Sequence, residues 1–254
     1  MKMKRAKSIL WLFPYSIRRL IVRTVRPNFY NTLQNMRTVE TSSGYSFKPF
    51  DENKCIFVHI PKSAGVSVSR ALFGNLAGGH AGINRYQIIF SQYEFDTYFK
   101  FTYVRNPWDR LVSAFHFFKE GGMAKPDRIF AEKHLSAYHD FEDFVRRGLK
   151  ENIEATHFIP QYRFVCDFGG VQPRVDFVGL YENLREDFNY IKDRLDISVN
   201  LKHQNKTSNR KKDYRDYYTD ETREIVANVY QKDIEIFGYD FDNSSLADQL
   251  TRRG

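Results

Sequence analysis

Two short apolar segments, each followed by a loop and a helix start, constrain the fold of this chain more than any other feature. Residues 55–60, CIFVHI, are rich in β-forming side chains and lead into PKSAG and then into a helical pattern. Residues 99–104, FKFTYV, lead through Arg-Asn to Pro107, and proline is tolerated in the first turn of a helix. Strands that alternate with helices predict an α/β protein. We expect a three-layer fold with a central, mainly parallel sheet flanked by helices.

The remaining pattern continues this alternation and divides the chain into three parts. A basic N-terminal arm and linker, residues 1–50, precedes a single domain, residues 51–242, and a polar tail, residues 243–254, follows it. Residues 27–50 look irregular, and the tail is expected to be loose. The domain is also expected to contain a strand over residues 174–180 and helices over residues 84–96, 184–194 and 220–237.

Composition argues against two classes of protein. Cys55 and Cys166 are the only cysteines, which is too few for a secreted scaffold held together by disulfides. No apolar run reaches the roughly 18 residues that are needed to cross a bilayer. The apolar run near the N-terminus lacks a small-residue cleavage pattern, so it does not resemble a signal peptide. We therefore expect a cytoplasmic protein.

The positive charge of the chain is confined to its arm. The net charge is +8, but residues 1–37 hold nine basic residues and no acidic one, which leaves 30 basic and 31 acidic residues over the remainder. A body without excess positive charge does not support binding to nucleic acid. The apolar residues of the arm are spaced roughly as on one face of a helix, with arginines between them; they are Ile9, Leu10, Leu12, Phe13, Ile17, Leu20 and Ile21.

This basic, amphipathic arm has two interpretations. In one, residues 1–37 make peripheral contact with an anionic membrane. In the other, the arm forms a helix that packs on the domain or on a partner subunit. Nothing in the pattern sets the oligomeric state.

The first loop, PKSAG at residues 61–65, has the parts of an anion site. A helix start leaves backbone N–H groups without partners inside the helix, and they point out of its N-terminus. Lys62 adds a mobile charge, Gly65 permits close approach, and Ser63 and Ser67 offer hydroxyl groups. The lysine precedes the glycine, unlike in the nucleotide-kinase pattern GxxxxGK[ST]. An ordinary strand-to-helix turn is the alternative.

The second segment, VRNPWDRLVSAFHFF, repeats this logic. Arg105 stands at the carboxyl end of the predicted strand, where open α/β sheets bind ligands. Ser113 lies seven residues after Asn106, two helical turns along the same face. An arginine fork with a nearby hydroxyl suits a terminal phosphate. For Arg110 the alternative is a surface ion pair with Asp109 or Glu120.

Together, CIFVHIPKSAGVSVSRALFG and FKFTYVRNPWDRLVSAFHFF resemble the carbohydrate sulfotransferases, of the sulfotransferase family 2 type. These enzymes use 3′-phosphoadenosine 5′-phosphosulfate (PAPS) as sulfuryl donor and release 3′-phosphoadenosine 5′-phosphate (PAP). GLYENLREDF and the stretch from NKTSNRKKDY to IEIFGYDF are similar to later parts of the family, so the resemblance covers about residues 54–241. It implies a P-loop-like fold and transfer to a hydroxyl of a glycan or glycolipid.

The resemblance also implies which residues bind the donor. The 5′-phosphosulfate would contact the first loop, and the 3′-phosphate would contact Arg105 and Ser113. Two positions depart from the family, because Ala64 often corresponds to glycine and Val66 to threonine. Lys206 and Arg210, in the basic loop HQNKTSNRKK, are candidates to close over the donor or an anionic acceptor, or belong to a solvated loop. The donor-binding residues of the first loop are Lys62, Ser63, Ala64, Gly65, Val66 and Ser67.

In-line sulfuryl transfer needs a group that stabilises charge on the leaving phosphate and a base that takes the acceptor's proton. Lys62 suits the first role. By resemblance the base is His80, in the glycine-rich loop GNLAGGHAGINRYQ, whereas the residues alone leave it an ordinary loop histidine. His157 is the alternative base, or binds the acceptor together with Gln161. His59 is expected in the core, and no metal-ligand cluster is recognisable.

Two other functions remain open at this stage. One is a P-loop nucleotide kinase or ATPase, which the missing GK[ST] disfavours. The other is a non-enzymatic, membrane-associated protein that binds polyanions through its basic arm.

Overall fold

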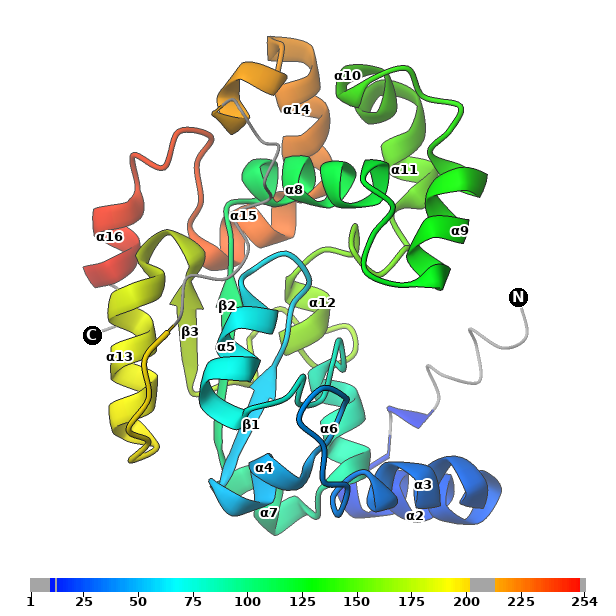
Figure 1. Cartoon of the computed structure of the whole chain (residues 1–254), viewed down its shortest axis with the longest axis vertical. Helices are drawn as coiled ribbons and strands as arrows, with labels where there is room; N and C mark the ends of the chain where they lie inside the picture. Colours follow the sequence, from blue (N-terminus) through cyan, green and yellow to red (C-terminus); the bar gives the residue numbers. More distant parts are fainter. Residues whose placement is uncertain (1–9, 12, 202–212, 252–254) are drawn as a thin grey trace.

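A computed structural model describes residues 10–11, 13–201 and 213–251 (Figure 1). Within these residues the strands are β1 (Cys55–Val58), β2 (Phe99–Val104) and β3 (Phe177–Leu180). The α-helices are α2 (Tyr15–Val25), α3 (Pro27–Asn35), α4 (Lys48–Glu52), α5 (Gly65–Phe73), α6 (Ile83–Ile89), α7 (Gln92–Thr97), α8 (Pro107–Lys119), α9 (Lys125–His134), α10 (Phe141–Asp143), α11 (Leu149–Asn152), α12 (Tyr162–Val165), α13 (Leu184–Arg194), α14 (Asp220–Val229), α15 (Gln231–Phe237) and α16 (Leu246–Thr251).

The three strands form one parallel sheet in the order β1-β2-β3. Phe57 of β1 lies opposite Phe101 of β2, which in turn lies opposite Phe177 of β3. Helices flank the sheet and extend beyond its carboxyl-terminal edge, where α8 lies directly after β2 (Figure 1). The predicted α/β fold with a parallel sheet is confirmed.

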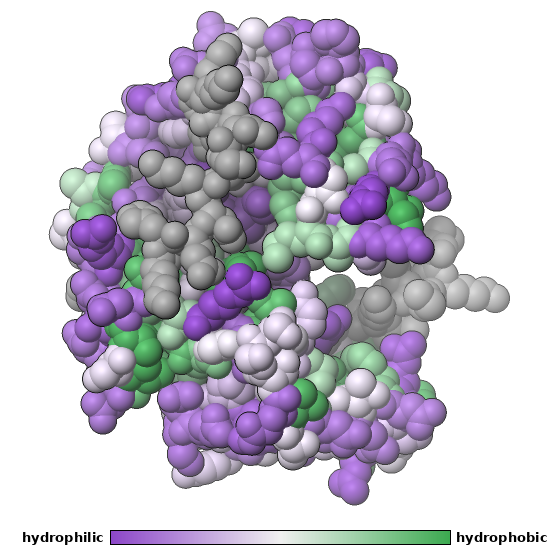
Figure 2. All heavy atoms as spheres, viewed as in Figure 1, coloured by the Kyte–Doolittle hydropathy of each residue, from purple (hydrophilic) through white to green (hydrophobic). Residues whose placement is uncertain are grey.

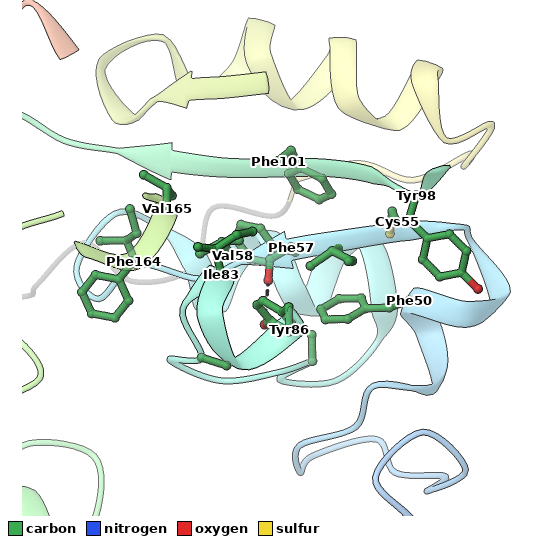
Figure 3. Close-up of a cluster of buried hydrophobic side chains, with 14 of the residues drawn as sticks. Phe50, Cys55, Phe57, Val58, Ile83, Tyr86, Tyr98, Phe101, Phe164 and Val165 are labelled. Carbon is green, nitrogen blue, oxygen red and sulfur yellow. Dashed lines mark hydrogen bonds between the residues drawn. The ribbon is translucent and has the colours of Figure 1, made fainter. Parts of the chain in front are cut away.

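The buried side chains form two clusters. The sheet core surrounds β1 and β2, and in it the Tyr86 hydroxyl donates a 3.0 Å hydrogen bond to the carbonyl oxygen of Phe57 (Figure 3). The α8 core lies among α8, α11 and α14 and includes Trp108, Phe144 and Phe158. The carboxyl ends of β1 and β2 lie where these two cores meet, so loops that leave the strands there can carry polar groups between them.

The arm packs on the domain wherever it is described. The Tyr15 hydroxyl donates to the carbonyl oxygen of Phe90 at 3.1 Å, and Val22, Tyr30 and Leu33 are buried in the sheet core. Of the two interpretations of the arm, packing on the domain is therefore observed for α2 and α3. Residues 1–9 and 12 lie outside the described residues.

Two regions that were predicted to be irregular contain helices. In residues 27–50, α3 begins with Pro27, and Pro49 lies in the first turn of α4; proline in a first turn was the available signal. The tail forms α16, where the Gln249 side chain donates to the carbonyl oxygen of Phe237 at 2.8 Å.

Two long predicted helices are each broken once. Residues 84–96 form α6 and α7, because the Ser91 hydroxyl and the Glu94 carboxylate make a reciprocal cap that starts a new helix. Residues 220–237 form α14 and α15, which are separated at Tyr230. The described surface seen in Figure 2 is largely hydrophilic, with hydrophobic residues in separate patches.

Candidate active site

The two loops singled out in the sequence lie against each other. Arg105, which follows β2, donates from Nη1 to the carbonyl oxygen of Lys62 at 3.0 Å. Gln161 also joins them, because its Oε1 accepts from the Arg105 amide at 2.9 Å and from the Ser63 hydroxyl at 3.3 Å. Both motifs therefore belong to one site at the carboxyl ends of β1 and β2.

The first loop presents the start of α5. Lys62 and Ala64 have left-handed backbone conformations, with φ of 69° and 64°, and the helix begins at Gly65. The residue at its N-cap, Ala64, makes no side-chain hydrogen bond that caps this start. Backbone N–H groups at an uncapped helix start in a turn of this kind are suited to an anion. The residues present thus fit the phosphosulfate end of a donor.

The packing of His59 requires a glycine at position 65. A Cβ at this position would lie 1.8 Å from Cδ2 of His59, so any larger residue would displace that ring. Ser63 is fully buried and bonded to Gln161, whereas Val66 and Ser67 are partly exposed in the first turn of α5. Val66 and Ser67 are therefore more accessible to a ligand than Ser63 is.

Lys62 is the cation nearest to this helix start in sequence. Its Nζ lies 4.2 Å from the centre of the Phe117 ring, over the end of α8. Burial, assisted by the nearby charge of Arg105, lowers the pKa of Lys62 to about 8. The ammonium group is therefore largely charged at neutral pH but loses its proton within the range in which enzymes are assayed.

Three histidines cluster beside Lys62. The ring of His80 lies 4.5 Å from that of His59 and 5.4 Å from that of His157, measured between ring centres. His157 also stacks on Phe117 at 4.7 Å. Burial is the largest cause that lowers the pKa of all three imidazoles, and the charges of Lys62 and Arg110 act in the same direction on His80 and His157. The cluster is uncharged at neutral pH, as a proton acceptor must be.

The backbone selects a tautomer of His80. Its Nδ1 lies 3.3 Å from the carbonyl oxygen of His59. A carbonyl oxygen only accepts hydrogen bonds, so this contact is a hydrogen bond when Nδ1 carries the proton. In the neutral ring, Nε2 is then the atom that can accept a proton. His59 itself is buried, as expected, and packs against Phe57.

The second motif differs from the first in its helix start. The Asn106 side chain caps α8 by accepting from the amides of Trp108 and Asp109, so those N–H groups already have a partner. The second segment is a strand end followed by a helix start, as predicted, but the N–H groups of its helix start are less open to a ligand than those of α5. A phosphate here would depend on side chains, namely Arg105 and Ser113.

Arg105 is held firmly in place. Its Nε donates to Asp109 at 2.7 Å, and its guanidinium lies 4.0 Å from the centre of the Tyr181 ring. Burial opposes the charge, but Asp109, Tyr181 and Glu182 outweigh it, and the pKa of Arg105 is raised. No described residue accepts a hydrogen bond from Nη2, which leaves that edge for a ligand. Ser113 is buried one turn beyond Asp109 on α8.

Arg110 is not on the surface, so its predicted ion pair with Asp109 or Glu120 is wrong. It is 1% exposed and donates to three carbonyl oxygens, those of Pro61 at 3.0 Å, His157 at 3.2 Å and Ile159 at 2.8 Å. A guanidinium has enough donors to satisfy several carbonyls at once. Arg110 therefore ties the first loop to the segment that carries His157.

Gln161 is fully buried, and both polar atoms of its side chain are bonded to Arg105. A direct contact with an acceptor gains no support from this position. The backbone N–H of Gln161 donates to the Asp233 carboxylate at 2.7 Å, and the backbone N–H of Tyr162 donates to the same carboxylate at 2.8 Å. Burial raises the pKa of Asp233 to about 6. No role for Asp233 was predicted from the sequence, because this residue lies in no recognisable motif.

Some predicted residues cannot be placed. Lys206 and Arg210 lie outside the described residues. Within the described part of the chain, no group of three His, Cys, Asp or Glu side chains is arranged to hold a metal ion. A search of the same residues found no helix with the length and apolar character that crossing a membrane requires.

Comparisons with known proteins show the family of the chain. A protein-family model described as the sulfotransferase family matches residues 45–240, which include all three strands, both loops and the histidine cluster. Searches of curated proteins and of solved structures found no match. A family model that covers this much of the chain is decisive, and the chain belongs to the sulfotransferase family.

Proposed function

We propose that this sulfotransferase moves the sulfuryl group of PAPS to a hydroxyl of a carbohydrate, on a glycan or a glycolipid. The observation that carries the proposal is the bond between Arg105 and the Lys62 carbonyl, because it sets an arginine and an uncapped helix start side by side. Two adjacent groups suited to anions fit a donor that carries phosphate at both ends. Membership of the family disfavours the nucleotide-kinase and non-enzymatic alternatives.

The proposed donor would span the two loops. Its phosphosulfate end fits the start of α5 with Lys62, and its 3′-phosphate fits the outer edge of Arg105 with Ser113. Bound there, PAPS supplies a sulfuryl group on a phosphate leaving group. Val66 offers no hydroxyl at its position, so Ser67 is the side-chain donor expected to contact the phosphosulfate in that turn.

The residues of the chain divide the chemistry between them. His80 accepts the proton of the acceptor hydroxyl at Nε2, while the His59 carbonyl holds its other nitrogen in the N–H form. Lys62 and the helix start stabilise the negative charge that grows on the leaving oxygen. His157, stacked on Phe117 beside His80, is proposed to orient the acceptor and remains the alternative base.

Nucleotide binding tests the donor site. We expect calorimetry to detect binding of PAP but not of ATP with magnesium, and weaker binding of adenosine 5′-phosphate, which lacks the 3′-phosphate. Arg105→Ala should weaken PAP binding by about 1.5–3 kcal/mol, the scale of a hydrogen bond to a charged group. It should leave the affinity for adenosine 5′-phosphate nearly unchanged. Equal affinity of the wild type for the two nucleotides would contradict the assignment of Arg105.

The acceptor requires a separate experiment. Labelled PAPS, incubated with panels of glycans and glycolipids, should label members of one carbohydrate class. Transfer to proteins or small phenols in place of sugars would overturn the carbohydrate part of the proposal and leave the donor part intact. We propose the cytoplasm as the compartment; the unpaired, buried thiols of Cys55 and Cys166 are compatible with it.

A further inference from the structure

Helix α2 carries apolar residues on two opposite faces. Tyr15 and Val22 face the domain, where Val22 is buried in the sheet core. Ile17 and Leu20 lie on the other side of the helix and are 42% and 58% exposed. Packing on the domain therefore accounts for one face of the helix and leaves the second without a partner among the described residues.

The segments that flank these two residues also carry exposed apolar side chains. Several exposed apolar side chains within one short segment mark an interaction surface. We call it the arm face. Its members are Phe13 at 40% exposed, Ile17 and Leu20, and, at the junction with α3, Val25 at 73% and Phe29 at 42%.

The orientation of the arm face is fixed by polar contacts on the inner side. The Arg18 guanidinium donates to the Gln87 side chain at 2.8 Å, and Arg19 donates to the carbonyl oxygen of Ile88 at 3.2 Å. Both acceptors belong to α6, so these arginines hold α2 against the domain. The helix cannot roll to bury Ile17 and Leu20 without breaking these contacts.

Positive charge surrounds the arm face. Arg23 and Arg26 are exposed, and the Arg26 guanidinium lies 6.0 Å from the centre of the Phe29 ring. The sequence holds no acidic residue before Glu40. A second copy of this surface would bring arginines against arginines, whereas anionic lipid headgroups would neutralise them.

We propose that the arm face docks the protein on an anionic lipid bilayer, with α2 lying in the plane of the interface. Its apolar side chains would enter the boundary between headgroups and acyl chains, and Arg23 and Arg26 would contact lipid phosphates. The surface shares no residue with the candidate active site. Its test therefore does not depend on the proposed function.

Vesicle sedimentation tests the surface with the full chain. Vesicles of phosphatidylcholine with 30% phosphatidylglycerol, at about 100 mM salt, should pellet the wild type, and pure phosphatidylcholine should pellet much less. The double variant Ile17→Ser/Leu20→Ser should lower the partition coefficient at least tenfold. Its matched control is Phe168→Ser/Val171→Ser, which removes two apolar side chains of similar exposure, 55% and 54%, far along the chain.

A second pair of variants isolates the charge. Arg23→Gln/Arg26→Gln should reduce binding to anionic vesicles at least fivefold, and Arg85→Gln/Arg185→Gln should not, although both remove two charges. An unchanged melting temperature would show that the variants are folded. Failure of the wild type to bind anionic vesicles, or equal losses in test and control variants, would overturn the proposal. A dimer that Ile17→Ser/Leu20→Ser dissociates, without vesicle binding, would assign the arm face to a second copy.

Discussion

The side-chain amide of Gln161 closes a ring of two hydrogen bonds with the backbone of Arg105. Its Oε1 accepts from the Arg105 amide at 2.9 Å, and its Nε2 donates to the Arg105 carbonyl oxygen at 2.8 Å. Arg105 lies just beyond β2, where the paired residues of β1 and β3 have ended. The ring therefore gives its backbone N–H and C=O groups the partners that the sheet does not supply. It thereby fixes the residue on which the proposed 3′-phosphate site depends.

Gln161→Glu tests this ring with almost no change of shape. The substitution replaces the Nε2 donor with an oxygen that faces a carbonyl oxygen, so a buried hydrogen bond is lost and a repulsion gained. We expect a loss of about 1–3 kcal/mol in the free energy of unfolding, measured by urea denaturation, together with weaker PAP binding. Gln92→Glu, at the exposed start of α7, is the control and should change neither. Normal PAP binding in Gln161→Glu would show that the ring does not position Arg105.

His80→Asn tests the base. The asparagine amide retains a donor for the His59 carbonyl but cannot take a proton, so turnover should fall about 100- to 10,000-fold while PAP binding stays near that of the wild type. A sulfate-transfer assay and calorimetry measure the two quantities. His139→Asn is the matched control, because that side chain is 90% exposed. If His157→Asn removes turnover and His80→Asn does not, the two histidines exchange roles.

The pH dependence of PAP binding reports on Lys62. Because the pKa of its ammonium group is about 8 in the free protein, the positive charge that attracts phosphate disappears as the pH rises above that value. The affinity should then fall by up to about tenfold per pH unit, the limit for one linked proton. Calorimetry between pH 7 and 9.5 measures the slope. Lys62→Arg keeps its charge throughout this range and should lose most of the slope; an equal slope in both proteins would assign the titration to another group.

The fold was predictable where the local preference for a secondary structure coincides with burial of the same residues. The run FKFTYV predicts β2 to the residue, because a β-forming segment and a buried position coincide there. Tyr230 illustrates the opposite case: the apolar period continues across it, so the sequence predicts one helix where the structure has two. The spacing of apolar residues shows which face of a helix is buried. It does not show where one helix ends and the next begins.

The site was predictable only in part for a similar reason. Lys62 and Arg105 stand at strand ends, which sequence context reveals. The neighbourhood of His59, His80 and His157 results from three distant segments that meet where the two cores join, and no local pattern encodes it. Arg110 looked like a surface residue because its three carbonyl partners come from loops that only the fold brings together.

Acid should destabilise the protein through its buried histidines. In the unfolded chain an imidazole takes up a proton near pH 6.5, whereas burial lowers the pKa of His157 to about 2 and that of His59 well below its ordinary value. The unfolded state thus binds more protons below pH 6.5, so stability is full above that pH and falls as the pH decreases. At pH 5 the loss is about 2 kcal/mol for each histidine that stays neutral in the folded state.

His157→Asn isolates this contribution. Asp233 acts in the opposite direction, because its raised pKa favours the folded state as the pH falls through about 6, so the wild type alone gives only the sum of the two effects. Urea denaturation of the wild type and the variant at pH 7 and at pH 5 removes the contribution of Asp233 by difference. The variant should lose about 2 kcal/mol less than the wild type between these pH values, whatever its stability at pH 7. His139→Asn is the control and should lose as much as the wild type, since that side chain is 90% exposed and lies outside the cluster. An equal loss in His157→Asn and the wild type would mean that His157 is protonated in the folded protein at pH 5, which would contradict the lowered pKa of this imidazole.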